Sequence, residues 1–203
     1  MNKMALCGLA VIAGTAGVAT AQVAAVDGFT GGSSFPIFYG GSTGDVVGFR
    51  FTADVDMSVT DLGILSNDGD GALDSPHMVG IWRNSDQALL GSVMVMPSST
   101  LIGDFRYEAV TPFNLVAGER YTAGALYTAD DNDSYFSSPA TLDLNGISDT
   151  NGVFPSEGSL GFTFPTEDST NLARLGPNFL WVPAPSSLAL LGLGGFVAAR
   201  RRR

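Results

Sequence analysis

The segment SNDGDGALDS, residues 66–75, concentrates the oxygen ligands that calcium prefers in proteins. Calcium loops place oxygen atoms at alternate positions and use glycine for a sharp turn. Four residues supply candidate ligands in this segment: Ser66, Asp68, Asp70 and Asp74. His77 stands where an EF-hand has its bidentate glutamate, so a looser Ca²⁺ loop is the functional interpretation. The alternative, which we favour, is a turn whose Asp and Asn side chains cap their own backbone.

A second acidic cluster, DDNDS, occupies residues 130–134. Three near-adjacent carboxylates repel one another unless a cation or solvent lies between them. A third oxygen-rich segment follows at residues 143–152. Solvated loops explain both segments adequately.

Side chains for covalent or acid–base catalysis are scarce. His77 is the only histidine, and the only cysteine, Cys7, lies close to the N-terminus. This argues against a cysteine nucleophile, a second catalytic histidine and a His-rich zinc site in the body of the chain. Carboxylate pairs are abundant and leave a secreted polysaccharide hydrolase as the enzymatic alternative. The sequence predicts that the protein is not an enzyme.

The charge of the chain is unevenly distributed. Lys3 and four C-terminal arginines mark the ends, whereas the stretch between them holds all twenty acidic residues and only five arginines. Such a surface repels phosphate backbones, so we expect no nucleic-acid partner. A solvated acidic coat is the preferred interpretation, with a dedicated cation binder as the alternative.

Short segments of alternating hydrophobicity, separated by turn residues, follow one another through the body of the chain. The expected strands are 46–53, 58–65, 77–84, 88–96, 105–110 and 119–128, with weaker candidates near 152–155, 160–164 and 178–182. No amphipathic helix is expected between residues 22 and 182. The pattern predicts an all-β domain over residues 22–177, an antiparallel β-sandwich or jelly roll.

Two aromatic features carry alternative interpretations. Trp82 is expected to fill the core, and a role in stacking on a ligand is the minor alternative. Tyr127, Tyr135 and Phe136 could form an exposed row beside Asp and Asn side chains, as a carbohydrate-binding module requires. Such a module, with or without Ca²⁺, would bind an extracellular polysaccharide.

The order of short motifs from residue 46 to residue 127 resembles a secreted bacterial β-sandwich domain of unknown function. The motifs are GFRFT at 48–52, VTDLG at 59–63, VGIW at 79–82 and the run from Thr111 to Tyr121. The resemblance implies a sandwich fold and brings no assigned catalytic residue.

The first 21 residues have the three parts of a secretory signal peptide. Lys3 supplies a positive charge, residues 5–18 form an apolar stretch, and Ala19 and Ala21 frame a small-x-small cleavage site. The apolar stretch is short for an N-terminal membrane anchor, which is the alternative. The sequence therefore predicts export, with cleavage after Ala21.

The end of the chain, from residue 178 on, holds a last strand or linker, a proline pair, a short apolar run and a basic tail. Residues 188–199 carry no charge and would span about 18 Å as a helix, against about 30 Å for a bilayer core. Pro183 and Pro185 prevent that helix from extending backward. The tail consists of Arg200, Arg201, Arg202 and Arg203, and it favours the cytoplasmic side. The pattern predicts transient membrane insertion, with an ordinary tail anchor as the alternative.

This three-part arrangement resembles a PEP-CTERM sorting domain. Residues 182–187 supply the motif, in which Ala184 stands where the family usually has glutamate. The resemblance implies cleavage by an exosortase-type transpeptidase in a region formed by Val182, Pro183, Ala184 and Pro185. It also implies an exported protein, held at the cell surface or in extracellular matrix, whose β domain has no assigned role.

Overall fold

The computed structural model describes residues 21–36, 43–66, 72–156, 158 and 160–184 of the chain. Every regular element among these residues is a β-strand, and all strand pairs are antiparallel. The described part of the chain contains no helix long and apolar enough to cross a membrane. The all-β prediction is therefore confirmed for the described residues. The helix expected over residues 188–199 lies outside them.

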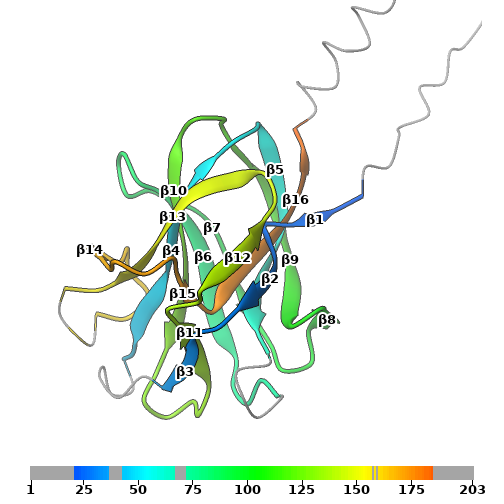
Figure 1. Cartoon of the computed structure of the whole chain (residues 1–203). Helices are drawn as coiled ribbons and strands as arrows, with labels where there is room; N and C mark the ends of the chain where they lie inside the picture. Colours follow the sequence, from blue (N-terminus) through cyan, green and yellow to red (C-terminus); the bar gives the residue numbers. More distant parts are fainter. Residues whose placement is uncertain (1–20, 37–42, 67–71, 157, 159, 185–203) are drawn as a thin grey trace, which may run out of the picture.

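Two large sheets form the body of the domain (Figure 1). The six-stranded sheet has the order β14-β13-β4-β10-β6-β7, and the five-stranded sheet has the order β1-β16-β5-β9-β8. The first consists of β4 (Asp45–Ala53), β6 (His77–Arg83), β7 (Leu89–Val95), β10 (Arg120–Tyr127), β13 (Ile147–Phe154) and β14 (Glu167–Asp168). The second consists of β1 (Val23–Ala24), β5 (Met57–Leu65), β8 (Thr100–Ile102), β9 (Phe105–Leu115) and β16 (Pro177–Pro183).

Two small sheets complete the domain, with the orders β15-β11-β3 and β12-β2. Their strands are β2 (Val26–Thr30), β3 (Ser33–Pro36), β11 (Ser134–Ser137), β12 (Thr141–Leu144) and β15 (Arg174–Leu175). None of the five exceeds five residues, so each offers too little alternation to predict a strand and its partner.

The core lies between the two large sheets, because successive side chains of a strand point to opposite faces. In β10, Tyr121, Ala123, Ala125 and Tyr127 all point inward and are buried. Phe51 of β4 meets Phe179 of β16 with their ring centroids 5.2 Å apart. Residues of both sheets thus share one core cluster.

The outer face of the six-stranded sheet is covered by the segment that precedes β14. Gly124 of β10 pairs with Gly80 of β6, and the absent side chains leave room for two rings. A Cβ atom on Gly124 would lie 3.1 Å from the Trp82 ring, and one on Gly80 would lie 2.8 Å from the Phe162 ring. Trp82 is buried, but against Phe162 on this outer face and not in the main core cluster. The strand predicted over 160–164 is wrong, because these residues lie across the sheet without a strand pairing of their own.

The strand β16 lies between β1 and β5, one strand in from the edge of the five-stranded sheet. Its side chains from Pro177 to Trp181 are buried. Asn178 is also buried and joins three elements. Its Oδ1 atom accepts the Val26 N–H at 3.1 Å, and its Nδ2 atom donates to the Val26 carbonyl at 2.7 Å and to the Tyr107 hydroxyl at 2.8 Å. The last strand is thereby an integral part of the domain.

Candidate functional site

The expected sorting motif begins inside the last strand of the domain. Val182 and Pro183, the first two residues of the motif, are paired with Ser58 and Met57 at the start of β5. Ala184 follows directly, is buried, and donates its backbone N–H to the Asp56 carbonyl at 3.2 Å. The predicted cleavage region is therefore folded onto the sheet up to Ala184.

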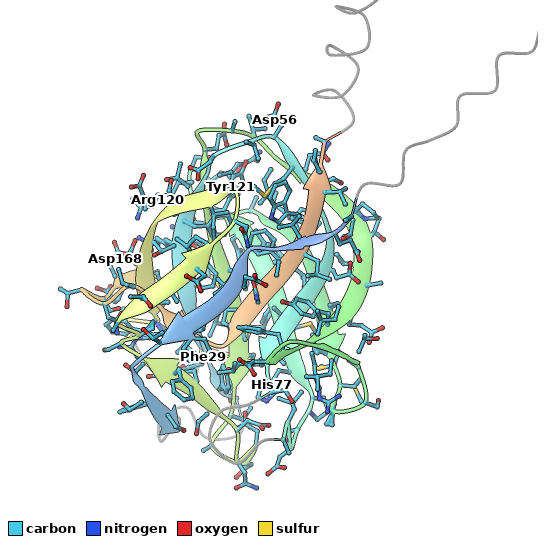
Figure 2. The ribbon with its side chains drawn as sticks, turned by 45° about the vertical axis from the view of Figure 1, so that its right-hand side comes forward. Phe29, Asp56, His77, Arg120, Tyr121 and Asp168 are labelled. Carbon is cyan, nitrogen blue, oxygen red and sulfur yellow. The ribbon has the colours of Figure 1, made fainter. Side chains whose placement is uncertain are left out.

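Two turns surround this point of exit, and hydrogen bonds join them. The β4–β5 turn contains Asp54, Val55 and Asp56, and the β9–β10 turn runs from Val116 to Glu119. The Asp56 carboxylate accepts the Ala117 N–H at 2.9 Å, and the Gly118 N–H donates to the Ala53 carbonyl at 2.7 Å. We call the set formed by residues 54–56, residues 116–119 and Ala184 the exit pole. Figure 2 places Asp56 beside the end of β16.

The N-terminal strand brings the other end of the domain to the same side. Val23 of β1 pairs with Trp181, so Gln22 lies near the end of β16. Figure 1 shows β1 beside β16 at this end of the domain. The Gln22 amide donates to the Asp61 carboxylate at 2.6 Å and to the Thr60 hydroxyl at 2.8 Å. Ala21, the last residue of the predicted signal peptide, is exposed, whereas Ala19 lies outside the described residues. The predicted mature N-terminus and the sorting motif therefore emerge close together.

His77 lies at the opposite end of the long strands, at the start of β6 (Figure 2). Its buried ring is held on both sides by acceptors. Nδ1 donates to the Leu126 carbonyl at 2.8 Å, and Nε2 lies 2.9 Å from the Asp133 carboxylate. Burial lowers the pKa of His77, but the hydrogen bonds to Asp133 and Leu126, together with the charges of Asp131 and Asp133, outweigh it and raise the pKa. These surroundings therefore stabilise the imidazolium form of the ring relative to that of a free histidine.

The Asp133 carboxylate joins the two acidic clusters of the sequence. Besides His77, it accepts the Asp74 N–H at 2.8 Å and the Ser75 N–H at 2.8 Å. Asp131 supports the same contact, because its carbonyl accepts the Ser75 hydroxyl at 3.0 Å and its carboxylate accepts the Thr128 N–H at 2.6 Å. Burial raises the pKa of Asp131. We call His77, Asp131 and Asp133, with the backbone of residues 74–75, the distal lock.

The structure describes only two of the four candidate calcium ligands. Ser66 is buried, and its hydroxyl accepts a hydrogen bond from the Arg106 guanidinium at 3.1 Å. The positive charge of Arg106 disfavours a bound cation at Ser66. Asp74 is exposed, and Asp68 and Asp70 lie outside the described residues. Within the described part of the chain, no group of three His, Cys, Asp or Glu side chains could hold a metal ion. The calcium loop stays a prediction.

The exposed aromatic row is wrong as a prediction. Tyr127 is fully buried and Tyr135 is 2% exposed. The Tyr135 hydroxyl accepts a hydrogen bond from the Arg174 guanidinium at 2.9 Å. Phe136 is half-buried and packs edge-on against Phe29, with ring centroids 5.2 Å apart. Tyr135 and Phe136 are adjacent in β11, so their side chains point to opposite faces of the strand. Other residues of the domain pack against both faces.

A shallow cavity of about 390 Å³ opens beside the exit pole. Its described lining residues are Asn84, Ser85, Glu119 and Arg120. Asn84 accepts the Thr122 hydroxyl at 2.8 Å, and Arg120 donates to the Asn151 side chain. The described residues of the lining offer no aromatic face for a sugar to stack on.

Comparison with known proteins identifies the end of the chain. A family model described as the PEP-CTERM protein-sorting motif matches residues 182–203, which confirms the resemblance seen in the sequence. No curated protein matches the chain. The motif is an exosortase recognition signal and marks an exported protein that is processed at the cell envelope. Pro185 and the four arginines 200–203 belong to the matched segment but lie outside the described residues.

Proposed function

We propose that the chain is a non-enzymatic, exported β-sandwich protein that an exosortase-type transpeptidase cuts in its sorting motif. After cutting, the β domain is kept at the cell surface or in extracellular matrix. The observation that carries the proposal is the match to the sorting motif over residues 182–203, which begins inside the last strand of the folded domain.

The sorting half of the proposal rests on the physics of the matched segment. Residues 188–199 are too short for a relaxed bilayer span, which suits a transient insertion. The prolines Pro183 and Pro185 mark the region that the enzyme recognises, and the four arginines keep the tail on the cytoplasmic side. Cleavage in this region leaves the domain without its membrane segment.

The non-enzymatic half rests on the state of the only histidine. His77 is buried and both of its ring nitrogens are engaged, so it offers no free nitrogen to a substrate. The carbohydrate-binding alternative loses the aromatic row on which it depended, since Tyr127 and Tyr135 belong to the core.

The decisive experiment is the intact mass of the native protein, with peptides mapped at both ends. We expect a mature form that starts at Gln22 and ends close to residues 183–185. A variant with Arg200–Arg203 all changed to Gln should accumulate uncut, whereas Arg83→Gln, which changes a half-exposed arginine of the body, should be cut normally. A native protein that retains Arg203 would overturn the proposal.

A further inference from the structure

We propose that the exit pole of the β domain rests on the lipid surface while the chain is still tethered, with Val55 and Val116 in contact with the bilayer interface. The inference rests on the proposed function, because it requires residues 188–199 to be inserted in the membrane. It adds an interaction surface to the β domain and names its partner, which is the membrane from which the tether emerges.

The first argument is the length of the tether. Ala184 is held on the domain by Asp56, and the apolar run begins at Leu188, so only Pro185, Ser186 and Ser187 lie between them. Even fully extended, four steps along the chain from Ala184 to Leu188 cover at most about 14 Å. The headgroup region on each side of a bilayer takes up about 5–8 Å of this distance. The exit pole therefore cannot move far from the lipid surface.

The second argument is the composition of the two turns that flank the exit. Val55 at the β4–β5 turn is 43% exposed, and Val116 at the β9–β10 turn is 51% exposed. Turns favour Gly, Pro, Asn, Asp and Ser, so valine has no conformational reason to be there. The hydrogen bonds from Ala117 to Asp56 and from Gly118 to Ala53 hold both turns beside Ala184. The fold thus presents two apolar side chains where the tether brings the domain to the lipid.

The third argument is the charge of the exit pole, which sets the strength of the contact. Asp54, Asp56 and Glu119 are acidic and repel anionic lipids. Two valines beside three carboxylates make a weak surface, which the tether supplements by keeping the local concentration of lipid high. The contact therefore ends when the chain is cut beyond Ala184, and processing releases the domain from the membrane.

The test uses residues 22–203, the form expected after removal of the signal peptide, reconstituted in vesicles of phosphatidylcholine that carry a nitroxide in the headgroup. This form contains no cysteine, because the only cysteine of the chain is Cys7. Single cysteines at Val55→Cys and Val116→Cys report on the exit pole, and Asp130→Cys, an exposed position near the distal lock, is the control. A fluorescent label on each cysteine should be quenched several-fold more at positions 55 and 116 than at position 130. Equal quenching at all three positions, with the protein floating with the vesicles, would overturn the docking alone. Failure to float would overturn the proposed function as well.

A second variant tests the effect of the short tether separately from the effect of the apolar side chains. A long Gly-Ser insertion between Ser186 and Ser187 leaves every described residue unchanged and frees the domain from the lipid. Quenching at position 116 should then fall to the level of position 130. Quenching that stays high despite the insertion would overturn the claim that the short tether maintains the contact.

Discussion

At the scale of single residues, the most informative group is His77. Its neighbours Leu126 and Asp133 come from the end of β10 and the loop after it, and both present oxygen acceptors to the ring. A histidine in this position stabilises two loops and does not need to reach solvent. Its role is therefore to close the distal end of the domain.

The charge of His77 can be measured without assignment, because it is the only histidine of the chain. We expect its imidazole C–H resonance to titrate with a midpoint above about 6.5, the ordinary pKa of histidine. Asp133→Asn should lower the midpoint, since it removes the carboxylate that stabilises the imidazolium, and Asp130→Asn should leave it nearly unchanged. A wild-type midpoint at or below the ordinary value would contradict the ring geometry.

The same raised pKa predicts how stability depends on pH. Because the folded pKa of His77 exceeds the unfolded value, its contribution is fully present below about pH 6.5 and is lost as pH rises through the folded pKa. The difference in free energy of unfolding between the wild type and His77→Gln should shrink over that interval. Urea denaturation at a series of pH values measures it, and a difference that grows with pH would count against the interpretation.

Asp133 is expected to be the most sensitive residue of the distal lock. Asp133→Ala removes the acceptor of two backbone N–H groups and of His77, and loss of one partner of a buried pair costs about 3–5 kcal/mol. The exposed neighbour Asp130 is the matched control, and its replacement by alanine should leave the urea midpoint unchanged. Equal midpoints for the two variants would show that the lock contributes nothing.

At the scale of elements, the buried side-chain amide of Asn178 makes the hydrogen bonds that the backbone of a neighbouring strand would otherwise make. It satisfies both backbone groups of Val26 and attaches β2 to β16. Asn178→Ala leaves these groups unpaired and should lower the free energy of unfolding by about 2–3 kcal/mol. Tyr107→Phe removes one of the hydrogen bonds and should cost about 1 kcal/mol. Chemical denaturation of both variants tests this, and an Asn178→Ala variant as stable as the wild type would refute it.

The alternation of apolar and polar residues was sufficient to predict most long strands of both large sheets, although β13 (Ile147–Phe154) was predicted only near 152–155. Six predicted strands, from 46–53 to 178–182, agree with the structure within one residue at each end. The strand predicted over 105–110 continues to Leu115, because Pro112 falls where the β5–β9 register shifts. The small strands escaped prediction because their pairing depends on distant residues, as when Ser137 meets Ser33.

The two candidate sites differ in the same way, because one could be predicted from the sequence and the other could not. The sorting signal could be read because its recognition depends on the linear order of prolines, apolar run and arginines. The distal lock could not, since Asp74 and Asp133 are separated by 59 positions and only the fold brings them within hydrogen-bonding distance. The sequence located both acidic clusters but contained no sign that one caps the other.

At the scale of the whole molecule, the domain has two functionally different ends. The long strands β4, β5, β6, β9, β10 and β16 run between the exit pole and the distal lock. The former holds the chain where we propose that it is processed, and the latter closes the core at the far side. Because β16 begins near the lock and ends in the sorting motif, the last strand connects the two.

This arrangement predicts where the chain can be shortened. A protein of residues 22–184 keeps all of β16 and the bond from Ala184 to Asp56, so we expect its melting temperature to match that of the full chain within a few degrees. A protein of residues 22–177 lacks the buried side chains Phe179, Leu180 and Trp181, leaves β1 without a partner and leaves one edge of β5 unpaired. Unpaired strands and a missing core segment should prevent cooperative folding. Circular dichroism during heating distinguishes the two, and a cooperative transition in the shorter protein would show that the last strand belongs to the sorting segment and not to the domain.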